Sequence, residues 1–121
     1  MNITDPRLFA SQGANGLWTL KVTAFFEVTP EEFDAGLEFE REATVFELDA
    51  VSADDLIIKS AALRFRPPSR KFPVEFEFQN LPRDLLDTEL GDEEITVQID
   101  VREVSTGAVA SSRTPTVTIS A

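Results

Sequence analysis

Acidic side chains are the groups in this sequence whose number and spacing could support chemistry. The 121 residues include 22 Asp and Glu against 11 Lys and Arg, so the formal charge is −11. Eleven acids and a single base, Arg41, lie between residues 27 and 55, and six acids with no base lie between residues 84 and 94. Calcium takes about six to eight hard oxygen ligands, which carboxylates supply. The charge pattern therefore indicates calcium as the ion to consider.

The two acidic segments are expected to meet at one end of the fold. If consecutive strands run antiparallel, alternate loops share an end, so the loop 49–55 and the crossover 80–94 lie together. The candidate calcium ligands are Asp49, Asp54, Asp55, Asp87 and Asp92, with Asp84 and Glu89 beside them. The spacing matches no EF-hand loop, and Asp is also common in turns because it hydrogen-bonds its own backbone. A solvated acidic surface is the alternative interpretation.

The composition argues against catalysis. The chain contains neither His nor Cys, which removes the commonest general base, the thiol nucleophile, the Ser-His-Asp triad and thiolate metal sites. A carboxylate pair could hydrolyse glycosides, but among 22 acids some pair always exists. No phosphate-binding loop or dinucleotide fingerprint is present. The sequence predicts a protein that is not an enzyme and needs no cofactor, calcium excepted.

Charge also narrows the class of partner. A strongly negative chain repels phosphate backbones and anionic membrane surfaces, so we expect neither nucleic acid nor membrane as a partner. The N-terminal residues lack a basic segment followed by an apolar one, and no apolar run is long enough for a membrane span. We therefore predict a cytoplasmic protein that contacts another protein or itself, as a possible homo-oligomer.

Strand periodicity dominates the chain between its turns. From Phe72 to Gln79, apolar and polar residues alternate strictly, and residues 95–102 and 18–28 repeat the pattern. Successive strand side chains point to opposite faces, so each segment predicts a strand with one buried and one solvated face. Further strands are expected at residues 37–48, 56–65 and 108–119, and a short one at residues 8–10. The total is about seven.

Turn and helix signals separate these strands. Asn15-Gly16 favours a tight turn with positive φ. Thr29-Pro30-Glu31-Glu32 has the form of a capping box and predicts one helical turn. Four leucines between residues 80 and 91 predict a short helical crossover. The sequence thus predicts one all-β domain over residues 1–121, an antiparallel immunoglobulin-like β-sandwich with a short helical crossover before the penultimate strand.

Several apolar residues fall on the face of a strand that is expected to be solvated. Phe25 lies opposite the apolar row of residues 18–28, and Leu56 and Ile58 lie opposite Ile57. A shift of parity near Phe46 indicates a bulge, which would turn one of the adjacent side chains out of the core. Single exposed hydrophobic residues are normal, whereas a cluster of them on one sheet would be an interface. We name Phe25, Phe46, Leu56 and Ile58 as candidate interface residues.

Two functional hypotheses follow from these patterns. The first is a non-catalytic protein–protein interaction or assembly module. The alternative is a calcium-binding module that resembles a C2 domain only in its acidic loop end. A smaller basic group, Arg66, Arg70 and Lys71, is expected at the opposite end of the sandwich. There it would face Glu31, Glu32 and Asp34, either as surface ion pairs or as a lip for an acidic partner.

Overall fold

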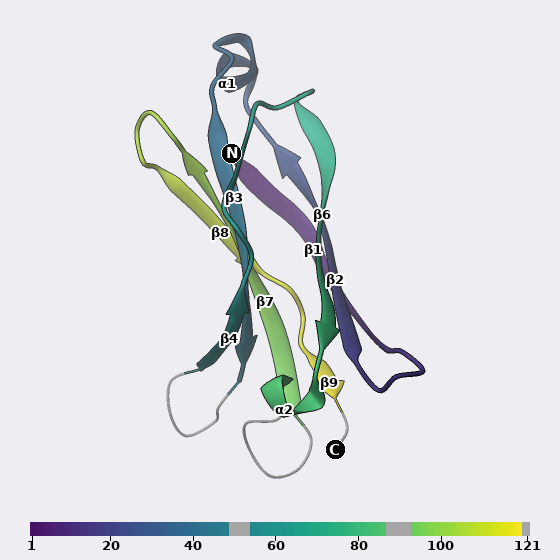
Figure 1. Ribbon diagram of the computed structural model, residues 1–121. Coiled ribbons are helices and arrows are strands. Elements are labelled where there is room, and N and C mark those ends of the chain that lie inside the picture. Colours follow the sequence, from purple (N-terminus) through teal and green to yellow (C-terminus); the bar gives the residue numbers. More distant parts are fainter. Residues whose placement is uncertain (49–53, 87–92, 120–121) are drawn as a thin grey trace.

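In the computed structural model the chain folds into two antiparallel β-sheets that face each other as two layers (Figure 1). The structure describes residues 1–48, 54–86 and 93–119. Within these ranges nine strands form: β1 (Asn2–Gln12), β2 (Trp18–Glu27), β3 (Phe39–Glu47), β4 (Asp55–Lys59), β5 (Leu63–Phe65), β6 (Lys71–Leu81), β7 (Glu93–Glu103), β8 (Val109–Arg113) and β9 (Val117–Ile119). Helix α1 (Pro30–Asp34) follows β2, and α2 (Arg83–Leu86) follows β6.

The first sheet has the strand order β1-β2-β6. The second has the order β4-β3-β7-β8, with β5 also paired to β3 and β9 also paired to β7. The prediction of an antiparallel all-β sandwich is confirmed at this level. The strand count differs from seven, because the segments 56–65 and 108–119 each form two strands. The crossover helix α2 consequently precedes the third strand from the end.

A serine or a threonine marks each point where an expected strand is divided. After β4, the N–H of Ser60 donates to the carbonyl of Ala43 (2.8 Å), and the Ser60 hydroxyl accepts from the N–H of Ala43 (2.9 Å). After β8, the N–H of Thr114 donates to the carbonyl of Val97 (2.9 Å), and its hydroxyl accepts from the N–H of Val97 (3.0 Å). In both places the hydroxyl occupies the role of a backbone carbonyl. The ladder is thus satisfied while the chain leaves the strand direction.

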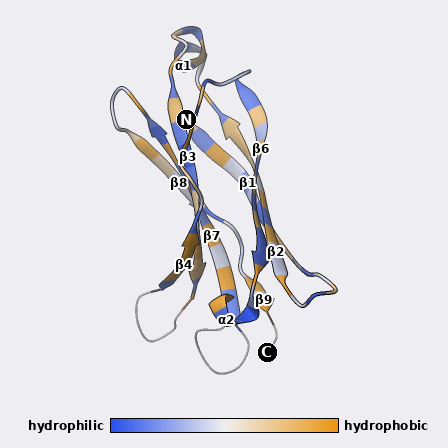
Figure 2. Ribbon diagram, viewed as in Figure 1, coloured by the Kyte–Doolittle hydropathy of each residue, from blue (hydrophilic) through white to orange (hydrophobic). Residues whose placement is uncertain are grey.

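Hydrophobic and hydrophilic residues alternate along the strands (Figure 2), and the apolar rows meet between the two sheets. The core draws on both sheets and is rich in phenylalanine. Phe26 is fully buried and its ring lies 5.8 Å from the rings of Phe65 and Phe72, while Phe39 stacks on Phe65 at 5.9 Å. Aromatic pairs at such distances add to the free energy gained by burial alone.

The local signals for turns and for the first helix are confirmed. Thr29 caps α1, its hydroxyl accepting from the N–H of Glu32 (3.1 Å) while the Glu32 carboxylate accepts from the N–H of Thr29 (2.9 Å). Gly16 and Gly107 have φ angles of 80° and 76° in the turns after β1 and β7. These are conformations that glycine adopts without the steric cost of a side chain.

Candidate functional site

The outer face of the β1-β2-β6 sheet carries a groove of about 740 Å³, which we call the phenylalanine groove. Phe9 from β1 and Phe25 from β2 line it with 52% and 37% of their surfaces exposed. Pro73 lies opposite Phe25 on β6. The remaining lining residues are Asp5, Arg7, Lys21, Thr23, Ala24, Val74 and Glu75. The groove therefore exposes aromatic side chains on the face of the sheet that is directed to solvent.

Strand register places these residues on one face. Thr23 in the middle of the sheet pairs with Arg7 on β1 and with Glu75 on β6. The β1–β2 register shifts between Thr4 and Arg7, and Asp5 within this bulge has a φ of 50°. A bulge bends its strand and increases the local twist. The groove lies beside that irregularity, with Asp5 at its border.

Ion pairs and one cation–π contact border the aromatic residues. The guanidinium of Arg7 binds the carboxylate of Asp5 (3.1 Å), and the ammonium of Lys21 lies 3.5 Å from Glu75. The Lys71 ammonium lies 5.4 Å from the centre of the Phe25 ring, which is within the range of a cation–π interaction. The two phenylalanines thus lie on either side of the polar row Arg7, Thr23 and Glu75, with charges of both signs close to them.

The four candidate interface residues do not form one cluster. Phe25 lines the phenylalanine groove, whereas Phe46 and Leu56 pair with each other on the second sheet. Leu56 is 59% exposed, and Phe46 is half-buried beneath the guanidinium of Arg113, 4.7 Å from its ring centre. Ile58 differs from the expectation, because it packs against the core.

A bulge explains the position of Ile58. Phe46 pairs with Leu56, but the preceding residue Val45 pairs with Ile58, so Ile57 is the extra residue of β4. Strict alternation would have placed Leu56 and Ile58 on the same face. The bulge turns Ile58 away from the face that carries Leu56. Ile57 and Ile58 both pack against the core.

Phe9 was not among the candidate interface residues, although it is the more exposed phenylalanine of the groove. The sequence does contain its signal, because Leu8 and Ala10 pack against the core and the residue between them must face outward. The expected strand at residues 8–10 was too short to show this pattern. In the structure the strand has 11 residues.

The acidic end of the sandwich is described only in part. The last residue of β3, Glu47, pairs with Ile95 at the start of β7, so the strand ends that flank the two acidic segments do meet. Asp54 is held by Arg113 at 2.8 Å, and Asp55 is exposed. Asp49, Asp87 and Asp92, like Glu89, lie outside the described residues. Among the residues that the structure describes, no group of three or more acids could hold a metal ion, and calcium binding stays a prediction.

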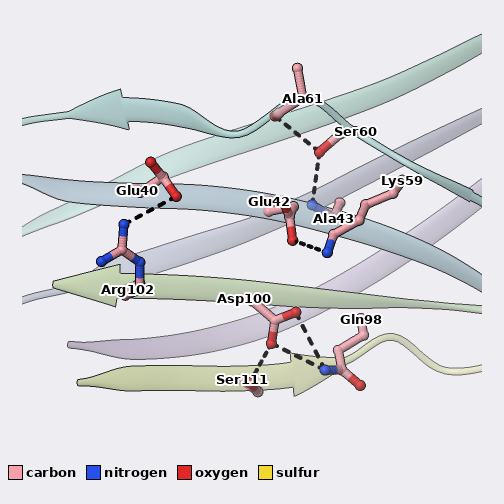
Figure 3. Close-up of polar contacts among 10 residues, drawn as sticks. All are labelled: Glu40, Glu42, Ala43, Lys59, Ser60, Ala61, Gln98, Asp100, Arg102 and Ser111. Atoms are coloured by element: carbon pink, nitrogen blue, oxygen red, sulfur yellow. Dashed lines mark hydrogen bonds and ion pairs between the residues drawn. The ribbon is translucent and has the colours of Figure 1, made fainter. Parts of the chain in front are cut away.

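A polar array covers the outer face of the second sheet (Figure 3). Glu42 and Asp100 are direct cross-strand partners, and like charges in such positions repel. Lys59 binds Glu42 at 2.8 Å, and this hydrogen bond and the Glu42 charge raise the pKa of Lys59 above its ordinary value of 10.5. Asp100 accepts from Gln98 (3.1 Å) and from the hydroxyl of Ser111. The array is therefore internally compensated.

The basic residues near α1 do not pair with the acids expected to face them. Arg66 donates to the carbonyl of Gly36 (2.8 Å) and lies 3.6 Å from the carboxylate of Glu38. Glu32 accepts instead from the amino group of Met1 (3.0 Å) and from Thr29. Arg66 and Glu32 thus each pair with a group outside the expected set, and a basic lip for an acidic partner stays a prediction.

Arg41 is an inward-facing cation at the side of the core. Its guanidinium lies 5.2 Å from the ring centre of Phe76 and 6.0 Å from that of Phe65. Burial lowers the pKa of Arg41 below its ordinary value. Arg41 belongs to β3 and Phe76 to β6, so this contact joins the second sheet to the edge strand of the first.

The chain matches no protein-family model, and a search of curated proteins finds no match either. Over the ranges that the structure describes, none of the helices combines the length and the apolar character required to cross a membrane.

Proposed function

We propose that this protein is a non-catalytic protein–protein interaction module and that the phenylalanine groove is its contact surface. The observation that carries the proposal is the exposure of Phe9 and Phe25 in one groove of about 740 Å³. Removing apolar surface from water is the main favourable term in protein association. Contiguous apolar grooves rimmed by polar residues are typical of interaction sites.

The charged residues of the groove support the same function. Protein interfaces combine an apolar, aromatic centre with a polar border that excludes water and sets specificity. In the groove, the pairs Asp5–Arg7 and Lys21–Glu75 lie between and beside the two phenylalanines and supply the polar part of such a surface. Charges of both signs fit a partner surface of mixed charge, which suits a protein better than a polyanion.

The distribution of the other groups is consistent with a binding role. The half-buried carboxylates Glu42 and Asp100 are already bound by Lys59, Gln98 and Ser111. The sequence offers no His or Cys to act as base or nucleophile. The groove itself contains two acids, each paired to a cation, and is otherwise apolar or neutral apart from those cations.

The test compares a groove variant with a matched surface variant. Phe9→Ser with Phe25→Ser removes the aromatic surface, and Leu63→Ser with Val109→Ser removes a similar exposed area from the second sheet, where these residues are 52% and 59% exposed. Light scattering measures self-association of each form, and affinity capture from the source organism measures retained partners. We expect only the groove variant to lose the contact, by more than about tenfold in affinity.

Both variants replace exposed residues, so each should unfold within about 0.5 kcal/mol of the wild type. A groove variant that keeps its full affinity for every partner and its oligomeric state would contradict the proposal. Equal losses in the two variants would also contradict it, because the effect would then not depend on the groove.

A further inference from the structure

The strand β6 forms one wall of the groove and also the edge of its sheet. Among the described residues β6 pairs only with β2. On the opposite edge of this sheet, β1 packs against β8 and β9 of the second sheet, and no comparable strand contact lies beside β6 in the described ranges. Within the described ranges the two sheets are therefore joined by strand contacts on the β1 side, whereas side chains make the contacts on the β6 side, Phe65 against Phe72 (5.8 Å) and Arg41 against Phe76 (5.2 Å).

The backbone of β6 presents hydrogen-bonding groups at that edge that none of the described strands pairs with. Pro73 lacks an N–H, and proline within a sheet is tolerated where that position faces away from the neighbouring strand. The carbonyl of Arg70, three residues earlier, accepts from Val28 after β2, so the even-numbered positions face β2. Alternate residues point their N–H and C=O groups to the same side. Glu75 and Glu77 consequently direct both groups to the open edge.

The core side chains of β6 confirm that this side is the less covered one. All four of these side chains are buried, but their relative exposures are the highest among the buried hydrophobic residues of the described chain: 8% for Phe72, 5% for Val74, 8% for Phe76 and 6% for Phe78. The inward side chains of an additional strand beside β6 would cover the surface that these four side chains still expose. Its outward side chains would lie next to Glu75, which Lys21 approaches at 3.5 Å, and Glu77, which accepts from Gln79 (2.7 Å).

We infer that β6 is a docking edge for an extended segment of a partner protein, paired by its backbone and carrying basic side chains at alternate positions. The inference rests on the proposed function and names the partner chemistry. Cross-strand pairs of opposite charge stabilise a sheet, whereas like charges oppose it. A second unmodified copy is therefore the wrong occupant, because antiparallel pairing of β6 with itself sets Glu75 opposite Glu77.

The protein itself supplies the probe for this inference. A Glu75→Lys, Glu77→Lys variant carries a β6 strand with lysine at the two outward positions. Mixed with the wild type at about 0.1–1 mM of each chain, it should form a 1:1 complex of twice the 13.4 kDa chain mass, at least about tenfold tighter than either chain with itself. Light scattering measures the mass. Amide hydrogen exchange should slow at residues 75 and 77 of both chains.

Two controls separate the edge from bulk charge. A Glu31→Lys, Asp34→Lys variant makes the same change of charge on α1 and should stay monomeric with the wild type. Glu77→Pro removes an outward N–H that β2 does not use, whereas Glu77→Gln removes the same charge and keeps that N–H; both should preserve the fold, and Glu77→Pro should weaken the mixed complex more. Each variant is checked for a native thermal transition before mixing.

Three outcomes would overturn the inference. The mixture could remain monomeric, the α1 control could pair equally well, or the wild type alone could dimerise through residues 75 and 77. The result is independent of the groove test, because the mixed complex forms through backbone groups that Phe9→Ser and Phe25→Ser leave unchanged. If the groove variant keeps its contacts but the mixed complex forms, only the proposed function fails. If the groove variant loses its contacts but the mixed complex does not form, only the inference about β6 fails.

Discussion

The hydroxyl of Thr114 offers the sharpest test of how the second sheet is held together. Thr114 is 5% exposed, and its hydroxyl accepts from the N–H of Val97, a residue with no exposed surface. Thr114→Val keeps the shape of the side chain but removes the acceptor. The N–H of Val97 would then be buried without a partner in the middle of β7.

The expected cost follows from this geometry. Leaving a buried donor unsatisfied costs about 1–3 kcal/mol, and water cannot easily replace the acceptor at a site this buried. Thr114→Ser keeps the hydroxyl and loses one methyl group, which costs about 0.8 kcal/mol. Ser60→Ala removes the equivalent hydroxyl at Ala43, but Ser60 is only half-buried. Water can substitute there, so we expect about 1 kcal/mol or less.

Thermal and denaturant unfolding give the free energies, and hydrogen exchange of the Val97 amide gives the local effect. For a domain of this length each kcal/mol lowers the Tm by about 3–6 °C. We expect Thr114→Val to cost more than Thr114→Ser and Ser60→Ala. If Thr114→Val is as stable as the wild type and its Val97 amide exchanges equally slowly, the structural role assigned to this hydroxyl is refuted.

Three further predictions concern stability. Phe26→Ala should cost about 3–5 kcal/mol in chemical unfolding, whereas Phe25→Ala on the outer face should stay within about 0.5 kcal/mol; similar losses would contradict the assigned faces. Thr29→Ala should lose about 1 kcal/mol from the cap of α1, and an unchanged Tm would refute that role. Burial raises the pKa of Glu32, but the hydrogen bond from Thr29 and the amino terminus outweigh it and lower the pKa below 4.5. Its stabilisation is therefore present above that pH and lost as the pH falls further. Glu32→Gln should reduce the loss of stability on acidification, and parallel pH curves would contradict this.

The local features of this fold were predictable because their causes lie within a few residues. Alternation from Phe72 to Gln79 predicted the buried and solvated faces of β6, since side-chain direction depends only on position along a strand. The capping box at Thr29 and the turn at Gly16 followed from side-chain hydrogen bonding and from backbone sterics. The exclusion of His and Cys chemistry required only the composition.

The prediction failed where pairing between distant strands decides the outcome. Ile58 turned inward because β4 carries a bulge against β3, and a one-residue change of register reverses the face of every following side chain. The segments 56–65 and 108–119 divided because Ser60 and Thr114 find partners 17 residues away, on β3 and β7. Neither partner is visible from local spacing.

The sequence by itself determined that the chain forms antiparallel strands with a phenylalanine-rich core and an acidic, cysteine-free surface. The tertiary structure decided which exposed residues share a surface. Phe9 and Phe25 lie 16 residues apart in sequence and line one groove only because β1 and β2 pair in this register, while Pro73 joins them from β6. Register is set by the burial of whole strand faces, which is a property of the assembled sheets.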